Sequence, residues 1–151
     1  MNNMQEKGHI HPVIRTVDEI VRVLSDMGFE VVTCDEVDDE YHNFDALNVP
    51  ADHPARDMQD TFWIKTPKGK DGEVVQNRPV MRTQTSSVQV RFLEKNKDNL
   101  PCAIIVPGKV FRNEATDATH EMQFFQIDGC MVGPNVSLAN LKAVLLEFYK
   151  Q

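Results

Sequence analysis

The chain has 151 residues, of which 41% are hydrophobic and 26% are charged, an ordinary composition for one soluble globular domain with a real core. Its formal net charge of −7, from 23 acidic and 16 basic residues, argues against nonspecific nucleic-acid binding by the whole surface. The sequence contains no run of 18 apolar residues, so no membrane span is predicted, and the polar N-terminus lacks the apolar core of a secretory signal. Three scattered cysteines, Cys34, Cys102 and Cys130, show no metal-ligand spacing and indicate a reducing compartment, by default the cytoplasm.

The first predicted element is a helix near the N-terminus. Thr16 and Glu19 read as a capping box, with Thr16 as the N-cap. A buried stripe follows at helical spacing, formed by Val17, Ile20, Val21 and Leu24. Gly28 suits the position just after the helix because glycine tolerates a left-handed backbone. His9 and His11 form a His-x-His pair without a third ligand nearby, so no metal site is predicted.

The middle of the chain reads as short elements joined by loops. Residues 29–33 suit a strand, and the acidic run 35–40 is most simply a solvated connection. Pro50 and Pro54 break any long element, which leaves a short helix near Phe44 and an ordered loop at 53–57. Residues 61–66 then suit a strand, and the Lys- and Gly-rich segment 67–77 an exposed hairpin tip.

The last third alternates a helix, a hairpin and a second helix. The pattern predicts a helix over 85–94 and antiparallel strands over 103–111 and 123–132. Ser137 caps a final helix whose apolar side is formed by Leu138, Leu141, Leu145 and Phe148. The order of elements predicts a single α+β domain over residues 1–151, with a mostly antiparallel sheet flanked by helices. We expect the helices that contain Val17 and Leu141 to cover one face of that sheet.

The hairpin over residues 109–129 carries the most unusual residues of the chain. On its second arm, side chains alternate between an apolar face, with Phe125, Ile127 and Met131, and a face with Phe124, Gln126 and Asp128. The second set suits a pocket better than a core. Arg112 and Glu114 lie at the loop mouth, and His120 at the far end of the loop. Together these groups suit a phosphate, a flat base and an amine, because a guanidinium forms paired charge-assisted hydrogen bonds with phosphate.

The sequence Phe111-Arg112-Asn113-Glu114 resembles motif 2 of class II aminoacyl-tRNA synthetases, whose core pattern is aromatic-Arg-x-Glu. Three segments are more specifically similar to the phenylalanyl-tRNA synthetase alpha-subunit family, in order and spacing: NFDALNVPADHPARDMQDTFWI, MRTQTSSVQVR and VPGKVFRNEATDATHE. The resemblance covers residues 8–149. It implies ATP-dependent activation of phenylalanine to an adenylate, with Mg²⁺ on the phosphates, and transfer to tRNA(Phe). It also implies a class II synthetase-like fold and a synthetase beta subunit as partner.

The resemblance assigns roles to particular residues. Arg112 would be the catalytic residue on the ATP α-phosphate, Phe124 would stack on adenine, and Glu114 would read its amino edge or order the loop. His120 would lie near the phosphates; the alternative is a hydrogen bond that orders the loop. The amino-acid site would be formed by Gln84, Ser86, Gln126 and Asp128. For Phe124 a place in the core, and for the loop at 53–57 a structural role, remain alternatives.

The chain also departs from the family pattern. Asp35 stands where motif 1 has a proline at the subunit interface, Gln84 where the family has histidine, and Asp128 where it usually has glutamate. Phe125 replaces a common histidine, but on the apolar face. No segment matches motif 3, so a catalytic-core fragment that is inactive alone and self-associates as a homodimer is one hypothesis. The other is a non-enzymatic synthetase-like paralogue that acts as a binding or assembly module.

Overall fold

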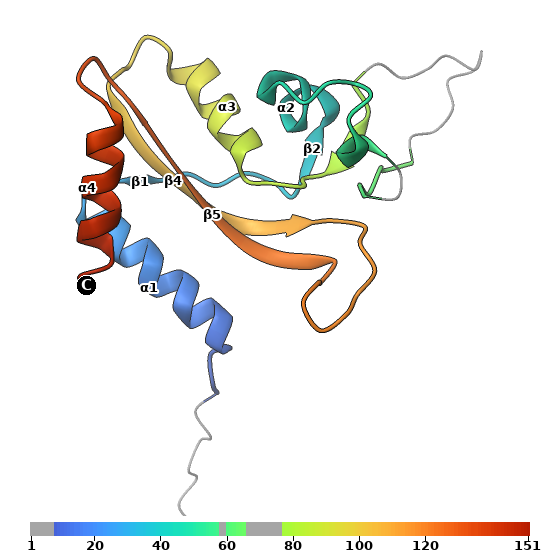
Figure 1. The fold of residues 1–151 in the computed structure, drawn as a ribbon, viewed down its shortest axis with the longest axis horizontal. Coiled ribbons are helices and arrows are strands. Elements are labelled where there is room, and N and C mark those ends of the chain that lie inside the picture. The colour runs from blue at the N-terminus through green and yellow to red at the C-terminus, as the bar shows by residue number, and fades with distance from the viewer. Residues whose placement is uncertain (1–7, 58–59, 66–76) are drawn as a thin grey trace, which may run out of the picture.

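The computed structural model describes residues 8–57, 60–65 and 77–151 (Figure 1). In chain order the elements are helix α1 (Pro12–Asp26), strands β1 (Glu30–Val31) and β2 (Val37–Asp39), helix α2 (Glu40–Asn43), 3-10 helices η1 (Asp45–Leu47) and η2 (Pro54–Arg56), strand β3 (Pro79–Met81), helix α3 (Ser86–Asn96), strands β4 (Cys102–Phe111) and β5 (Gln123–Val132), and helix α4 (Leu138–Phe148). Among these described residues, no helix has both the length and the apolar character needed to cross a bilayer.

The centre of the fold is a three-stranded sheet in the order β1-β4-β5. Strand β1 runs parallel to β4, whereas β5 pairs antiparallel with β4 over its full length, with Val106 opposite Asp128 and Val110 opposite Phe124. A second, two-stranded antiparallel sheet joins β2 to β3. Helices α1 and α4 lie on one side of the long hairpin, and α2 and α3 on the other (Figure 1). The predicted α+β class and the predicted hairpin are therefore confirmed.

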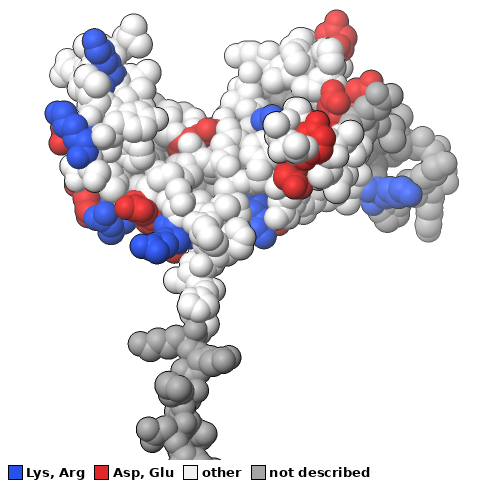
Figure 2. Space-filling model, turned by 60° about the horizontal axis from the view of Figure 1, so that its bottom comes forward, with Lys and Arg blue, Asp and Glu red and all other residues white. Residues whose placement is uncertain are grey.

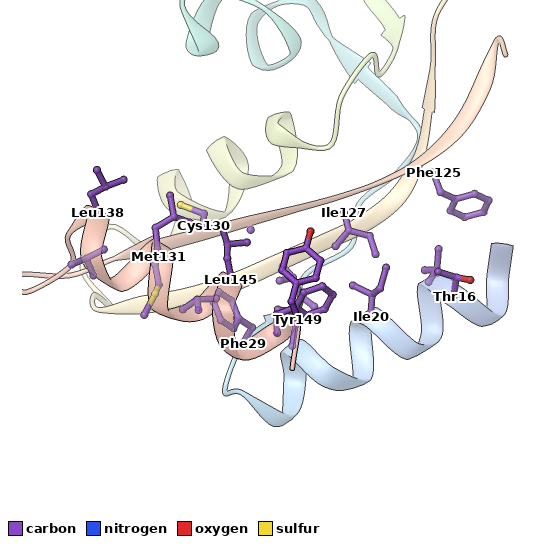
Figure 3. A pocket seen from close by; sticks show the side chains of 18 of the residues that line it. Thr16, Ile20, Phe29, Phe125, Ile127, Cys130, Met131, Leu138, Leu145 and Tyr149 are labelled. Carbon is purple, nitrogen blue, oxygen red and sulfur yellow. The ribbon is translucent and has the colours of Figure 1, made fainter. Parts of the chain in front are cut away.

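The two faces of the hairpin meet different surroundings, as the alternation in the sequence predicts. On the α3 side, Val88 of α3 packs against Ile104 and Val106 of β4, with Phe92 and Cys130 at the edge of this cluster. On the other side, β5 directs Phe125, Ile127 and Met131 toward α1 and α4 (Figure 3). A period of two along a strand separates these sets without any long-range information.

The predicted start of the first helix is wrong, whereas its end is right. Helix α1 begins at Pro12, and His11 is its N-cap, with the His11 Nδ1 accepting a hydrogen bond from the Val13 amide at 3.2 Å. Thr16 lies inside the helix, where its hydroxyl donates to the Pro12 carbonyl. A proline at the first helical position has a preset φ and needs no amide donor, which favours the earlier start. Gly28 follows the C-cap with φ of +95°, as predicted.

Several short elements differ from the sequence predictions. The predicted strand 29–33 is reduced to β1, and residues 61–65 form only an isolated bridge between Trp63 and Val80. Trp63 is held instead by its side chain, which donates to the Arg56 carbonyl and stacks under the Arg78 guanidinium. The short helix near Phe44 is confirmed by α2 and η1, and the helix over 85–94 by α3. The predicted hairpin tip lies outside the described residues, apart from Asn77.

The composition of the acidic run 35–40 predicts a solvated connection, and this prediction is wrong. It contains β2, and the Asp38 side chain is only 2% exposed. Arg91 of α3 donates hydrogen bonds to both Asp38 and Asp39. Its positive charge balances these carboxylates, which the composition alone predicts to be solvated. Burial works against the charged forms, but these ion pairs and the bonds from His42 outweigh it. The pKa of Arg91 is therefore raised and the pKa of Asp39 lowered.

Gly108 of β4 allows the buried Arg82 side chain to lie directly against the strand. The Arg82 Nε donates to the Lys109 carbonyl at 2.7 Å and its Nη1 to the Cys34 carbonyl at 3.1 Å, so the guanidinium is held in place. A Cβ on Gly108 would overlap Nη2 and lie 3.0 Å from Cζ. We expect Gly108→Ala to lower the free energy of unfolding by roughly 1–3 kcal/mol, measured by urea denaturation.

Gly129 of β5 is the matched control for this substitution. A Cβ there would have its nearest neighbours at 3.8 Å, which is ordinary contact. Gly129→Ala should therefore leave stability unchanged or raise it slightly, because alanine restricts the unfolded chain more than glycine does. Equal losses for the two variants would contradict the packing that we describe for Arg82.

Candidate functional site

Arg112 directly follows β4 and reaches two of the other predicted site segments. Its guanidinium lies over the Phe124 ring, 4.9 Å from the ring centroid, and its Nε donates to the Thr83 carbonyl at 3.4 Å. The Arg112 amide donates to the Met122 carbonyl at 2.9 Å, which extends the hairpin pairing beyond β4. The structure thus brings Arg112, the predicted phosphate-binding residue, against Phe124, the predicted stacking residue.

A row of polar groups continues along β5 on the same face. The Ser86 hydroxyl, at the start of α3, donates to Asp128 Oδ2 at 2.6 Å. The Gln126 amide nitrogen donates to Asp128 Oδ1 at 3.0 Å. Ser86 therefore lies on the same side of the sheet as Gln126 and Asp128, as a shared amino-acid site requires. The carbonyl oxygen of the Gln126 side chain is buried and has no hydrogen-bond partner among the described residues, so its capacity to accept a hydrogen bond is unused there.

A small cavity of about 270 Å³ opens beside Arg112. It is lined by Phe44, Val49, His53, Ala55, Asp60, Thr83, Gln84, Arg112 and Glu114. Three predicted site residues, Gln84, Arg112 and Glu114, therefore share this cavity. The residues of the row along β5 do not line it; they connect to it through the contact of Arg112 with Phe124. Sequence reasoning missed Thr83 and Asp60, although both lie within segments that carry the family resemblance.

The loop that contains His53 has both a structural and a lining role. Arg56 is largely buried, forms ion pairs with Glu40 and Asp45, and lies over the Phe44 ring. These contacts fix η2, whereas His53 at its N-terminal end faces the cavity. The structural role that the sequence leaves open is therefore observed for Arg56.

His120 is exposed and contacts residues of its own loop. Its Nδ1 lies 2.9 Å from the Asp117 carboxylate, which also accepts hydrogen bonds from the Thr119 and His120 amides. These bonds, led by that of the Thr119 amide, lower the pKa of Asp117. The geometry favours the alternative in which His120 orders the loop.

A larger cavity, about 840 Å³, lies on the opposite face of the hairpin, between α1, α4 and β5 (Figure 3). Its lining is almost entirely apolar and includes Ile20, Phe125, Ile127, Leu141 and Phe148. We call this surface the apolar groove. On the face shown in Figure 2, uncharged residues fill most of the central hollow, and charged side chains lie mainly around its edges. With so few polar groups the groove is suited to packing and not to chemistry.

One cluster has the composition of a metal site. Asp38, Asp39 and His42 each place a ligand atom within 4.8 Å of the others. Arg91 already pairs with both carboxylates, and His42 lies between Asp39 and Glu94, with Nε2 3.0 Å from Glu94. A guanidinium in this position opposes a second cation, so the cluster is an ion-pair network that joins β2 and α2 to α3.

Comparison with known proteins shows the family to which the chain belongs. A family model described as "tRNA synthetases class II core domain (F)" matches residues 1–151. The phenylalanine–tRNA ligase alpha subunit of Dehalococcoides mccartyi strain BAV1 is 47% identical over 144 residues, which cover 95% of this chain and 40% of that protein. The corresponding subunit of Bacillus mycoides strain KBAB4 is 46% identical over 146 residues, covering 97% and 39%. The chain thus spans about 40% of the length of these curated relatives.

A solved structure shares the fold at much lower identity. The pyrrolysyl-tRNA synthetase from Desulfitobacterium hafniense has a TM-score of 0.70 and 14% sequence identity, and the match covers 92% of this chain and 46% of that one. At this identity the similarity shows only a common fold.

Proposed function

The chain belongs to the tRNA synthetase class II core domain family (F), and we propose that it forms the motif 1 and motif 2 part of a phenylalanine–tRNA ligase catalytic core. The observation that carries the proposal is the placement of Arg112 over Phe124, on the face that also holds Gln126, Asp128 and Ser86. Such a face provides neighbouring places for a phosphate, a base and an amino acid.

Arg112 would bind the α-phosphate of ATP and stabilise the charge that develops there. In the first step a carboxylate oxygen of phenylalanine attacks the α-phosphorus, and the bond to pyrophosphate breaks. A planar guanidinium provides parallel donors to the phosphate oxygens, and its fixed place over Phe124 lowers the reorganisation needed in the transition state. Adenine would stack near Phe124. Mg²⁺ would arrive with the phosphates and neutralise part of their charge.

Gln126 and Asp128 would hold the ammonium group of phenylalanine. The buried Gln126 oxygen, which has no partner within the described part of the chain, would accept from the amine, and Asp128 would supply the countercharge that a desolvated amine requires. Ser86 orients Asp128 through its 2.6 Å hydrogen bond. Gln84 lines the cavity beside Arg112 and would donate to the substrate carboxylate or to a phosphate.

The proposed partners follow from the same assignment. They are phenylalanine, tRNA(Phe) and a synthetase beta subunit, with the cytoplasm as the compartment. With a net charge of −7, the chain is unsuited to holding tRNA through its own surface alone. Most phosphate contacts to tRNA would therefore come from the rest of the enzyme.

A chimeric ligase tests the proposal directly. Residues 8–151 replace the matching segment of the Bacillus mycoides alpha subunit, which is 46% identical, and the product is expressed with the beta subunit of that enzyme. We call this enzyme the chimeric ligase. It should catalyse phenylalanine-dependent ATP–pyrophosphate exchange. Exchange at the background rate, in a chimera that assembles with the beta subunit, would support the paralogue hypothesis instead.

The isolated chain should bind ATP weakly and should not charge tRNA. Its cavity beside Arg112 is only about 270 Å³, and the loop that carries Glu114 and His120 is largely exposed, so ligand binding must order it. Calorimetric titration with ATP and Mg²⁺ should give a dissociation constant of about 1 mM or weaker. A low-micromolar constant, or charging of tRNA by the chain alone, would contradict this expectation.

The isolated chain should also self-associate through the apolar groove. Leu138 is 81% exposed, and Leu141 and Leu145 lie half-exposed beside it. Sedimentation at tens of micromolar protein should show a dimer or larger species that persists in 1 M salt, because salt does not screen apolar contacts.

Leu141→Glu should shift this chain toward the monomer, whereas Lys142→Glu, on the adjacent exposed position, is the matched control. A monomer for the unaltered chain would overturn the proposed association. Dissociation in moderate salt would reject only its apolar mechanism.

A further inference from the structure

Asn43, the last residue of α2, is completely buried, and its side chain contacts a site segment 40 residues further along the chain. Its Nδ2 donates to the Thr83 hydroxyl at 3.1 Å, and its Oδ1 accepts from the Thr83 amide at 3.1 Å. The orientation of the Asn43 amide is unambiguous, because a backbone N–H requires an acceptor. This paired contact fixes both the side chain and the backbone of Thr83.

The same arrangement extends to two proposed site residues. The Thr83 carbonyl accepts a hydrogen bond from Arg112 Nε at 3.4 Å, and the Nε2 of the Gln84 side chain donates to the backbone carbonyl of Asn43 at 3.3 Å. One buried residue therefore fixes the N–H and the hydroxyl of Thr83, and the carbonyl of the same threonine contacts the guanidinium proposed to bind phosphate. Asn43 is itself held by its neighbour Phe44, which packs against Trp63 and under Arg56.

We propose that Asn43 is a positioning residue of the amino-acid activation step, whose side chain sets the place of Arg112 through Thr83 and whose backbone carbonyl sets the place of the Gln84 side chain. This inference rests on the proposed function, since it assumes that Arg112 binds the reacting phosphate. Displacement of a catalytic group by about 1 Å lowers rates by about 100-fold. A residue that touches no substrate can therefore have a large effect on the rate.

The first test uses the isolated chain and needs no activity. Nuclear magnetic resonance measures solvent exchange of the Arg112 Nε–H, which should become about tenfold faster in Asn43→Ala, as expected for loss of one net hydrogen bond. The control is Asn99→Ala, at an exposed position, which should leave the exchange unchanged. An unchanged rate of solvent exchange at the Arg112 Nε–H in a folded Asn43→Ala chain would overturn the proposal.

A second pair of variants covers the case in which Asn43→Ala does not fold. Thr83→Val keeps the size of the side chain but removes the hydroxyl that Asn43 binds, whereas Thr83→Ser keeps the hydroxyl. Thr83→Val should accelerate Arg112 exchange by about threefold or more and Thr83→Ser by less than that, since only the former breaks the hydrogen bond. Equal exchange rates in these two variants would contradict the proposed connection.

The last test is a double-mutant cycle in the chimeric ligase, read as kcat/KM for ATP in pyrophosphate exchange. Asn43→Ala alone should lower kcat/KM by about 10- to 100-fold. In an Arg112→Ala background, the same substitution should lower kcat/KM by about twofold at most. A merely structural role would produce the same loss in both backgrounds and would overturn the inference. If the unaltered chimera shows no pyrophosphate exchange, the proposed function fails and the role in activation fails with it, whereas the solvent-exchange measurement still decides whether Asn43 positions Arg112.

Discussion

Replacing Arg112 by alanine is expected to lower phenylalanine-dependent ATP–pyrophosphate exchange of the chimeric ligase by about 100- to 1,000-fold. The reason is that electrostatic groups aimed at developing charge account for effects of this size in other enzymes. The loss should fall mainly on kcat, because the proposed interaction with the α-phosphate would strengthen as the reaction proceeds. Steady-state exchange at varied ATP concentrations separates the two parameters.

Arg112→Lys and Arg15→Ala are informative controls for this prediction. Lysine keeps the charge but loses the planar fork and the contact over Phe124, so it should recover only part of the activity. Arg15 lies exposed on α1, on the other side of the hairpin, and its replacement should have no effect on exchange. If Arg112→Ala raised KM for ATP alone and left kcat unchanged, Arg112 would serve ground-state binding and not the chemical step.

Replacing Arg91 by alanine is expected to lower the free energy of unfolding by about 3 kcal/mol. The Asp38 side chain is only 2% exposed and would lose its cationic partner, which is the costly way to break a buried ion pair. Urea denaturation of the isolated chain measures this loss. The network also joins α3 to β2, so the structure near Ser86 would loosen with it.

A surface ion pair provides the matched control. Arg22 pairs with Asp26 at 3.3 Å on α1, where both side chains are mostly exposed, and Arg22→Ala should change stability by about 0.5 kcal/mol or less. Combining Asp38→Asn with Arg91→Met should recover part of the loss, because no buried charge is then left unpaired. Similar losses for Arg91→Ala and Arg22→Ala would show that the acidic run is solvated, as its composition suggests.

The features that the sequence predicts well are local. Alternation over residues 123–132 places Phe124 and Gln126 on one face and Phe125 and Ile127 on the other, because the side-chain period of a strand is fixed by its backbone. Gly28 and Ser137 mark helix boundaries for equally local reasons, since one supports a left-handed backbone and the other caps a helix.

The features that the sequence does not predict depend on tertiary contacts. Asp38 meets Arg91 53 residues away, and Asn43 meets Thr83 40 residues away, so neither pair shows any periodic signal. The composition of the acidic run predicts solvation, because a composition carries no information on which distant cation packs against the carboxylates. The start of α1 is predicted wrongly for a different reason. Thr16 and Glu19 match the sequence pattern of a capping box, but they lie inside a helix that begins at Pro12.

Phenylalanine-dependent ATP–pyrophosphate exchange by the unaltered chimeric ligase tests the central claim most directly. The claim is that this chain supplies a working motif 2 face, with Arg112, Phe124, Gln126 and Asp128 in catalytic positions. We predict pyrophosphate exchange within about tenfold of the rate of the Bacillus mycoides enzyme, which corresponds to a loss of no more than about 1.4 kcal/mol of transition-state stabilisation. Exchange at the level of the Arg112→Ala chimera, in a folded assembly that contains the beta subunit, would contradict it.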